Sequence, residues 1–289
     1  MPYALTRDRT ALYYEDTGKG IPVIFVHEFS GDSRSWEAQV RFFSRRYRCI
    51  TFNARGYPPS DVPRARARYS WRIAIDDIAD LLRHLRIRKA HIVGCSMGAY
   101  SSLQFGLRYP SMVLSITSVG AGAGSDPDTR EQFLAATESH ARLFETRGTA
   151  AALKQRGISA SRMPQKRKDP RGFAEFRRIH EGHSAQGLAH VLRGVQARRP
   201  PVYALGHALK RLQRSLFVVC GDEDDSSIGP ALFLKKCCPD ARLWISPSTG
   251  HTVNTEEPDA FNRNLLDFLT LIENSPRRRP ASGSAPNRR

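Results

Sequence analysis

Two hydrophobic patterns alternate along the chain. Short runs of continuously apolar residues are typical of strands buried on both faces of a parallel sheet. Longer stretches with apolar residues three or four positions apart are typical of amphipathic helices. The short runs predict two minor strands followed by six main ones, at residues 3–6, 11–15, 22–27, 48–53, 90–95, 113–119, 215–220 and 241–245.

Predicted helices separate most of these strands. One begins after Ser70, a suitable N-cap, and Pro110 ends another. Because short connections join alternating strands and helices, the pattern predicts the α/β class, with a doubly wound, mostly parallel sheet. Besides the helix after Ser70, the predicted helices are residues 35–47, 97–109, 230–237 and 258–272.

The alternation lapses in residues 121–212. This stretch is polar, Arg-rich and helical in pattern, and it contains no strong strand. We expect a helical insertion that covers the sheet as a lid. With this insertion, residues 1–274 are long enough to form one large α/β domain rather than two small domains.

The charge of the chain is strongly positive, with 45 Lys and Arg against 28 Asp and Glu and a formal net charge of +17. Residues 275–289 contain five Arg and no acid, so we expect a disordered basic tail there. Much of the remaining charge lies in separate stretches of residues 161–200. No nucleic-acid-binding motif accompanies this charge, so we interpret it as solvated surface and expect no nucleic-acid partner.

The location of the protein is also constrained by its sequence. The N-terminal residues lack the apolar stretch of a secretory signal, and no apolar run is long enough to cross a bilayer. The five cysteines form neither a disulfide framework nor a C-x-x-C metal pair. We therefore expect a cytoplasmic protein with reduced thiols and no membrane association.

A candidate nucleophile lies between a predicted strand and a predicted helix. Residues 94–98 read Gly-Cys-Ser-Met-Gly, a G-x-S-x-G pattern. In a tight strand-to-helix turn, the two glycines allow close backbone approach and the serine hydroxyl projects from the helix N-terminus. The alternative role of Ser96 is a simple helix N-cap. The flanking strand and helix favour the nucleophile.

A serine nucleophile needs a base and a carboxylate that orients the base. Four acids follow the predicted strand at residues 215–220, and His251 follows the last predicted strand in a glycine-bearing loop. The chain order Ser, Asp, His is the order that hydrolases with a G-x-S-x-G turn require. The pattern alone leaves Asp222, Asp224 and Asp225 open as the acid.

Four further motifs make the chain resemble the α/β-hydrolase superfamily over residues 3–272. Residues 27–31 (HEFSG) resemble its H-G-x-x-G loop, and residues 55–60 (RGYPPS) resemble its R-G-x-G-x-S turn. Residues 221–224 (GDED) resemble its G-x-x-D acid loop, and residues 250–251 its G-H base.

This resemblance assigns the site residues. It implies Ser96 as nucleophile, Asp224 as acid, His251 as base, and the backbone N–H groups of Met97 and Phe29 as the oxyanion hole. It implies no cofactor, and the remaining histidines lack the spacing of a zinc site. His27, His180, His183 and His190 are interpreted as structural or exposed.

The resemblance also implies a function. We expect a serine hydrolase that cleaves a carboxylic ester or a related activated carbonyl of a small molecule through an acyl-enzyme. A serine at this turn argues against the dehalogenase and epoxide-hydrolase branches, which use aspartate. A C–C bond hydrolase, a peptidase, an acyltransferase or a small-molecule receptor with a retained triad would share these motifs.

Two positions depart from the family pattern. Glu28 replaces the usual glycine of the oxyanion loop, and Pro58 replaces the second glycine of the R-G-x-G-x-S turn. An ionised Glu28 aimed at the oxyanion would oppose it, so we expect Glu28 to turn away and pair with a cation. Arg55 is the first candidate, because its turn follows the neighbouring strand of the predicted sheet. Most basic side chains of the insertion are expected to face water; they include Arg162, Lys166, Arg167, Lys168, Arg177 and Arg178.

Overall fold

A computed structural model describes residues 2–275 of the chain. Within these residues, eight strands form one sheet in the order β1-β2-β4-β3-β5-β6-β7-β8. The strands from β3 to β8 are parallel, whereas β2 is antiparallel to both β1 and β4. Their bounds are β1 Tyr3–Leu5, β2 Ala11–Thr17, β3 Ile21–Val26, β4 Tyr47–Phe52, β5 Ala90–Cys95, β6 Val113–Val119, β7 Ser215–Gly221 and β8 Arg242–Ser246.

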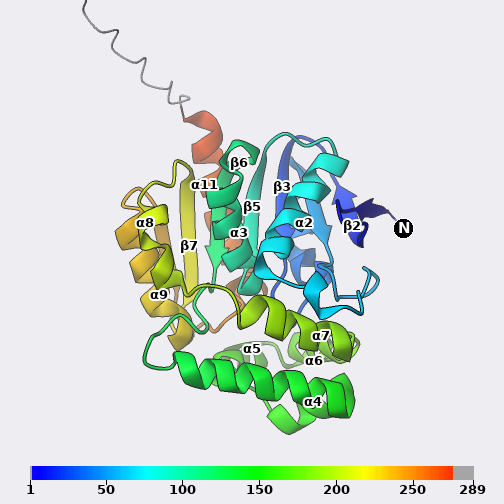
Figure 1. The fold of residues 1–289 in the computed structure, drawn as a ribbon. Coiled ribbons are helices and arrows are strands. Elements are labelled where there is room, and N and C mark those ends of the chain that lie inside the picture. Colours follow the sequence, from blue (N-terminus) through cyan, green and yellow to red (C-terminus); the bar gives the residue numbers. More distant parts are fainter. Residues whose placement is uncertain (1, 276–289) are drawn as a thin grey trace, which may run out of the picture.

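Helices cover both faces of this sheet (Figure 1). One face packs against α1 and α11, which contribute Phe43, Phe261 and Phe268 to its core. The other face packs against α2, α3 and α9. The predicted α/β class and mostly parallel sheet are therefore confirmed. The helix bounds are α1 Glu37–Phe43, α2 Trp71–His84, α3 Met97–Arg108, α9 Asp225–Cys237, α10 Val253–Glu256 and α11 Pro258–Asn274.

The central strands are continuously apolar because they contribute to two cores at once. In β3, Val23 and Phe25 belong to the core under α1 and α11, while Ile24 and Val26 belong to the core under α2 and α3. Successive side chains of a strand point to opposite faces, so a strand covered on both sides needs apolar residues at every position.

Between β6 and β7 the chain forms a group of helices that we call the inserted helices, residues 130–209. The longest, α4, bends at Gly148, which has a φ of +73°. The group comprises α4 Arg130–Arg156, η4 Ala160–Arg162, α5 Met163–Lys168, α6 Pro170–Glu181, α7 Ala185–Val191, the π-helical turn η5 Leu192–Gln196, η6 Val202–Leu205 and α8 Gly206–Leu209.

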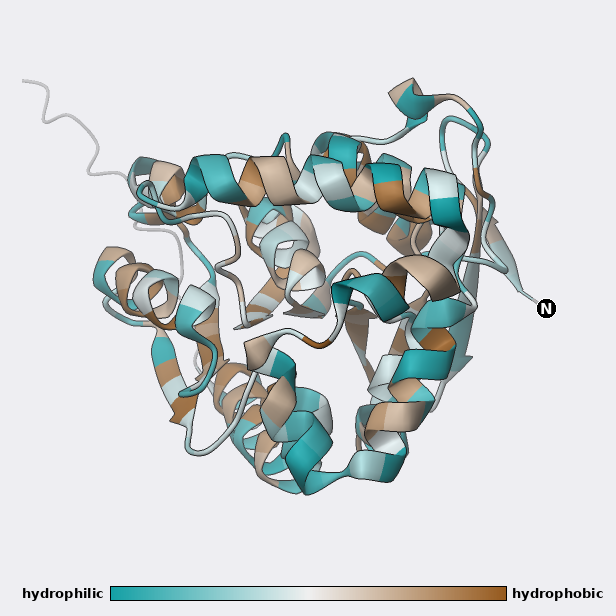
Figure 2. Ribbon diagram, turned by 90° about the horizontal axis from the view of Figure 1, so that it is seen from below, coloured by the Kyte–Doolittle hydropathy of each residue, from teal (hydrophilic) through white to brown (hydrophobic). Residues whose placement is uncertain are grey.

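Most of the inserted helices lie below the sheet in the view of Figure 1, with α4 farthest from it. Figure 2 shows hydrophilic and hydrophobic positions alternating along the helices at this end, as expected for helices with one face against protein. A third apolar cluster joins Phe144, Leu188 and Val191 of the inserted helices to Phe29 and Met97. The inserted helices therefore pack directly on residues predicted to form the oxyanion hole.

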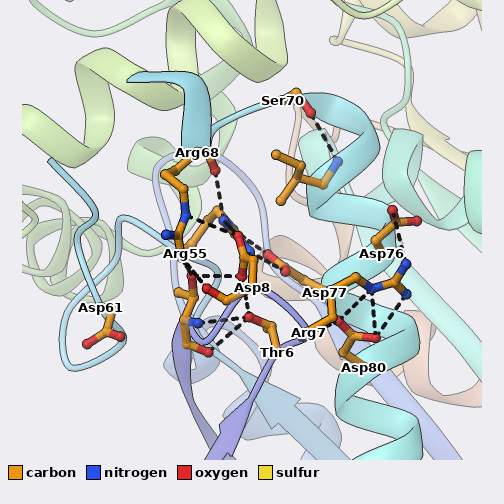
Figure 3. Close-up of polar contacts among 12 residues, drawn as sticks. Thr6, Arg7, Asp8, Arg55, Asp61, Arg68, Ser70, Asp76, Asp77 and Asp80 are labelled. Atoms are coloured by element: carbon orange, nitrogen blue, oxygen red, sulfur yellow. Dashed lines mark hydrogen bonds and ion pairs between the residues drawn. The ribbon is translucent and has the colours of Figure 1, made fainter. Parts of the chain in front are cut away.

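Arg55 belongs to a polar network beside α2 (Figure 3). Its Nε and Nη2 donate to the two carboxylate oxygens of Asp77 at 2.7 and 2.6 Å, and its Nη1 donates to Asp8 at 2.9 Å. The predicted pairing of Arg55 with Glu28 is wrong. Helix α2 instead supplies the buried carboxylate of Asp77, which the guanidinium of Arg55 binds in bidentate geometry.

Three further expectations concern the chain as a whole. None of the helices formed by residues 2–275 combines the length and apolar character needed to cross a membrane. All five cysteines are free. The predicted disordered tail begins at Ser275, and its residues 276–289 lie outside the described part of the chain.

Candidate active site

Ser96 occupies the turn between β5 and α3. Its backbone has φ +52° and ψ −111°, a conformation that is strained for any residue with a Cβ. A Cβ on Gly94 would lie 2.2 Å from the carbonyl oxygen of Gly98, and a Cβ on Gly98 would lie 2.1 Å from that of Val26. The two glycines therefore allow α3 to start against the sheet, and Ser96 stands at its N-terminus.

The Ser96 hydroxyl lies against the His251 imidazole. The distance from Ser96 Oγ to His251 Nε2 is 2.8 Å, and His251 Nδ1 lies 2.6 Å from Asp224 Oδ2. An ionised carboxylate can only accept a hydrogen bond, so Nδ1 carries the imidazole proton and Nε2 accepts from Ser96. The structure thus brings together the three side chains predicted to form a triad.

Asp224 is buried at the end of β7, with 1% of its surface exposed. Burial alone would raise the pKa of its carboxyl group, but attraction to His251 and hydrogen bonds from that ring and from Ser226 lower it to about 2. Asp224 is therefore ionised at neutral pH. Of the other candidate acids, Asp222 accepts the backbone N–H of Thr249, and Asp225 is exposed at the start of α9.

The pKa of His251 is raised above its ordinary value. Burial of the ring lowers this pKa, but the charge of Asp224 and its hydrogen bond to Nδ1 outweigh burial. Asp224 therefore makes His251 a stronger base than a free imidazole, as a group that removes a proton from serine must be.

The loop that carries His251 is fixed from both sides. The carboxylate of Glu256 accepts the backbone N–H groups of Gly250 at 2.8 Å and Thr252 at 3.1 Å. The N–H of His251 itself donates to the carbonyl of Ser161, at 2.9 Å, in the inserted helices. This arrangement holds the imidazole in line between Ser96 and Asp224.

The loop after β3 carries the second expected oxyanion donor. The N–H of Ala54 donates to His27 Nε2 at 3.0 Å, so His27 Nδ1 bears the proton and donates to the carbonyl of Glu28 at 2.6 Å. A planar trans peptide fixes its N–H opposite its C=O. His27 therefore sets the direction of the Phe29 N–H through the peptide that Phe29 shares with Glu28.

The two expected oxyanion donors have free N–H groups. Within residues 2–275, neither Phe29 N nor Met97 N donates to a protein acceptor. Met97 is also the first residue of α3, where the helix dipole favours negative charge. Both residues are buried, and Phe29 is further held by a hydrogen bond from Tyr57 to its carbonyl oxygen.

Glu28 turns toward the inserted helices. Its carboxylate accepts from Nη2 of Arg162, and both side chains are buried. Glu28 pairs with a cation, as predicted, but the cation is Arg162 rather than Arg55. Among the basic side chains expected to face water, Arg162 is buried and Arg177 is half-buried, whereas the others are exposed: Lys166, Arg167, Lys168 and Arg178.

Some residues that shape the site were not predicted from the sequence. Glu256 and Arg162 hold the loops on either side of Ser96, and Ser226 donates to Asp224 Oδ1 at 2.9 Å. Ser226 lies two positions from Asp224 and Glu256 lies four positions from Thr252, so both contacts are local in the chain. Arg162 is separated from Glu28 by 134 positions, so no local pattern could connect them.

The four histidines interpreted as structural or exposed are all buried: His27, His180, His183 and His190. His180 packs edge-on against Phe29, with ring centroids 6.1 Å apart, and burial holds its pKa well below the ordinary value. In the part of the chain that the structure describes, no group of three or more His, Cys, Asp or Glu side chains is arranged to hold a metal ion.

Comparison with known proteins gives a consistent family match. A family model described as the alpha/beta hydrolase fold matches residues 21–258. The chain is 24% identical over 270 residues to 2-(acetamidomethylene)succinate hydrolase of Mesorhizobium japonicum. The aligned region covers 90% of this chain and 92% of that protein.

Solved structures extend the match. A thermophilic esterase from Thermogutta terrifontis has a TM-score of 0.80 and 25% identity, with 94% of this chain and 98% of that chain covered. Est816, an enzyme that degrades N-acyl homoserine lactone, has a TM-score of 0.73 and 26% identity, with 92% and 100% covered.

Proposed function

The chain belongs to the family of the alpha/beta hydrolase fold, and we propose that it is a serine hydrolase that cleaves a carboxylic ester through an acyl-enzyme intermediate. One observation carries this proposal: an unbroken line of hydrogen bonds runs from Asp224 through His251 to a serine held in a strained strand-to-helix turn. The names of two of the compared proteins, an esterase and a lactone-degrading enzyme, support the ester class.

The first half of the reaction forms the acyl-enzyme. Ser96 Oγ attacks the ester carbonyl carbon while His251 Nε2 takes the hydroxyl proton, and the carbonyl oxygen becomes an oxyanion between the N–H groups of Phe29 and Met97. When the intermediate collapses, the bond to the leaving oxygen breaks and His251 returns the proton to the departing alcohol. Asp224 stabilises the imidazolium throughout.

The second half releases the acid. A water molecule attacks the acyl carbon, His251 Nε2 takes one of its protons, and the same oxyanion forms again. Collapse of this intermediate breaks the bond to Ser96 Oγ, which regains its proton from His251. The products are a carboxylic acid and the free enzyme.

The inserted helices act as a lid in this proposal. Only 8% of the Ser96 surface and 7% of the Met97 surface is exposed. The cover comes in part from the apolar cluster that joins Phe29 and Met97 to Phe144 and Val191. A substrate would reach Ser96 only if part of this cover moved, and substrate choice would depend on its lining.

We expect steady turnover of short aryl esters such as 4-nitrophenyl butyrate, with a rate that rises from acid toward neutral pH. His251 must be neutral to accept the Ser96 proton, and Asp224 raises its pKa. The midpoint of the acid limb of kcat/KM is therefore expected above about 6.5, the ordinary pKa of histidine. Stopped assays between pH 5 and 9, in buffers of constant ionic strength, measure it.

The same assay tests the receptor alternative. A single slow turnover that leaves a stable adduct would contradict a hydrolase, since a receptor with a retained triad would behave in that way. A rate that is independent of pH between 5 and 8 would contradict the role of His251. Turnover of esters together with formation of new esters from added alcohols would point to an acyltransferase.

A further inference from the structure

The buried ion pair between Glu28 and Arg162 joins the two loops that flank Ser96. Glu28 belongs to the loop that carries Phe29, and its carboxylate binds Arg162 Nη2. Arg162 Nη1 donates to Thr252 Oγ1 at 3.0 Å, on the residue after His251. Within residues 2–275, neither side chain has a second ion-pair partner. The two charges therefore neutralise one another, and neither charge neutralises another side chain of the described residues.

Both residues are adjacent in the chain to residues of the proposed site. Glu28 directly precedes Phe29, and consecutive Cα atoms are about 3.8 Å apart. Arg162 directly follows Ser161, whose carbonyl accepts the N–H of His251. Burial and Asp224 dominate the pKa of His251, but Arg162 lowers it and Glu28 raises it in addition. The two charges of the ion pair therefore shift the pKa of His251 in opposite directions, and the two shifts partly cancel.

Both terminal nitrogens of the Arg162 guanidinium are already in use. Nη2 is bound to Glu28 and Nη1 to Thr252, and the guanidinium carbon stacks 4.6 Å from the centre of the Phe176 ring. A guanidinium with free donors at this place would attract a carboxylate on the substrate. With Glu28 in place, the pair carries no net charge, and both terminal nitrogens of Arg162 already have acceptors.

We propose that Glu28 is a specificity-determining residue: it neutralises Arg162 and makes the enzyme select substrates with uncharged acyl groups. This inference rests on the proposed ester hydrolysis. It gives a physical reason for a carboxylate where the family usually has glycine. Removing the charge of Glu28 while keeping its shape should convert the site into one that favours an acyl group with a distal carboxylate.

The test compares two isosteric esters. One is the mono-4-nitrophenyl ester of adipic acid, which carries a distal carboxylate, and the other is the corresponding primary amide, which is neutral. The ratio of kcat/KM for the anionic ester to that for the neutral ester is measured at pH 8 for the wild type, Glu28→Gln, Arg162→Met and Glu28→Gln/Arg162→Met. Glu37→Gln is the matched control, because it removes one carboxylate from an exposed ion pair with Arg41 on α1.

Glu28→Gln is expected to raise this ratio at least tenfold, and Arg162→Met to lower it at least threefold. The double variant should return to within about threefold of the wild type, and Glu37→Gln should stay within twofold. Arg162→Met tests the same idea if Glu28→Gln does not fold. Equal losses for both esters in the single variants would show that the pair only holds the loops together, and would overturn the proposal.

A binding measurement separates this proposal from the proposed function. Thermal shifts with adipate and with adipamide need no turnover. Adipate should stabilise Glu28→Gln more than it stabilises the wild type, while adipamide should affect both alike. If the wild type hydrolyses neither ester, the proposed function fails and these shifts alone decide. Equal shifts by adipate in the two proteins would then refute the role of Glu28.

Discussion

Replacing Ser96 by alanine is expected to lower kcat for aryl esters by roughly 10⁴-fold or more, because the substitution removes the hydroxyl oxygen that lies 2.8 Å from His251 Nε2. The remaining groups could still bind substrate and polarise its carbonyl, so a small residual rate is compatible with the mechanism. Steady-state assays with 4-nitrophenyl butyrate give the comparison.

The fold of this variant should be unchanged. The hydroxyl contributes little packing, and alanine can occupy the same backbone conformation with similar strain. Ser102→Ala is the matched control, since Ser102 is a buried serine on the same helix whose hydroxyl bonds to the carbonyl of Gly98 at 2.8 Å. It should keep kcat within severalfold of the wild type. Undiminished turnover in Ser96→Ala would rule out Ser96 as the nucleophile.

Asp224→Asn is expected to lower kcat by about 10³- to 10⁴-fold with the structure preserved. An asparagine amide can donate to Nδ1, which favours the tautomer with the proton on Nε2, where it no longer accepts from Ser96. Loss of the carboxylate also removes the attraction that raises the pKa of His251. Any residual activity should therefore show an acid limb at lower pH than the wild type.

The neighbouring acids provide the controls. Asp225→Asn should change kcat by less than threefold, because Asp225 is exposed at the start of α9. Asp222→Asn should have a modest effect, since this side chain supports the loop by accepting the N–H of Thr249. If either substitution is more damaging than Asp224→Asn, a different carboxylate orients His251.

The central strands could be predicted closely from the sequence. The structure gives β5 and β6 the predicted bounds, 90–95 and 113–119. Burial on both faces leaves a continuous apolar run whose ends are visible in the sequence. Helix ends were harder to predict. Helix α9 begins at Asp225, five residues before the predicted start at Pro230, so this proline lies inside the helix and does not mark its first residue.

The predicted first helix was also too long. The pattern predicted a helix through residue 47, but α1 ends at Phe43 and Tyr47 is the first residue of β4. Tyr47 continues the helical spacing of apolar residues and is buried in the same core as Phe43. The periodicity of apolar residues alone does not separate a helix from the strand that follows it when both contribute side chains to the same core.

Part of the site could be predicted from local sequence motifs, and the rest depends on long-range contacts. The positions of Ser96, Asp224 and His251 follow from short motifs at strand ends, and the fold brings those ends together. The partner of Glu28 depends on where the inserted helices pack, which no motif encodes. The sequence-based choice of Arg55 used strand adjacency and missed the carboxylate of Asp77 on α2.

The identity of the nucleophile is tested most directly by covalent labelling with a fluorophosphonate, followed by proteolysis and mass spectrometry. One adduct is expected, on the peptide that contains Ser96, and it should be absent from Ser96→Ala and slowed in Asp224→Asn. The adjacent thiol is a poor competitor, because burial raises the pKa of Cys95 well above its ordinary value. An adduct on Cys95, or unchanged labelling of Ser96→Ala, would contradict Ser96 as the nucleophile.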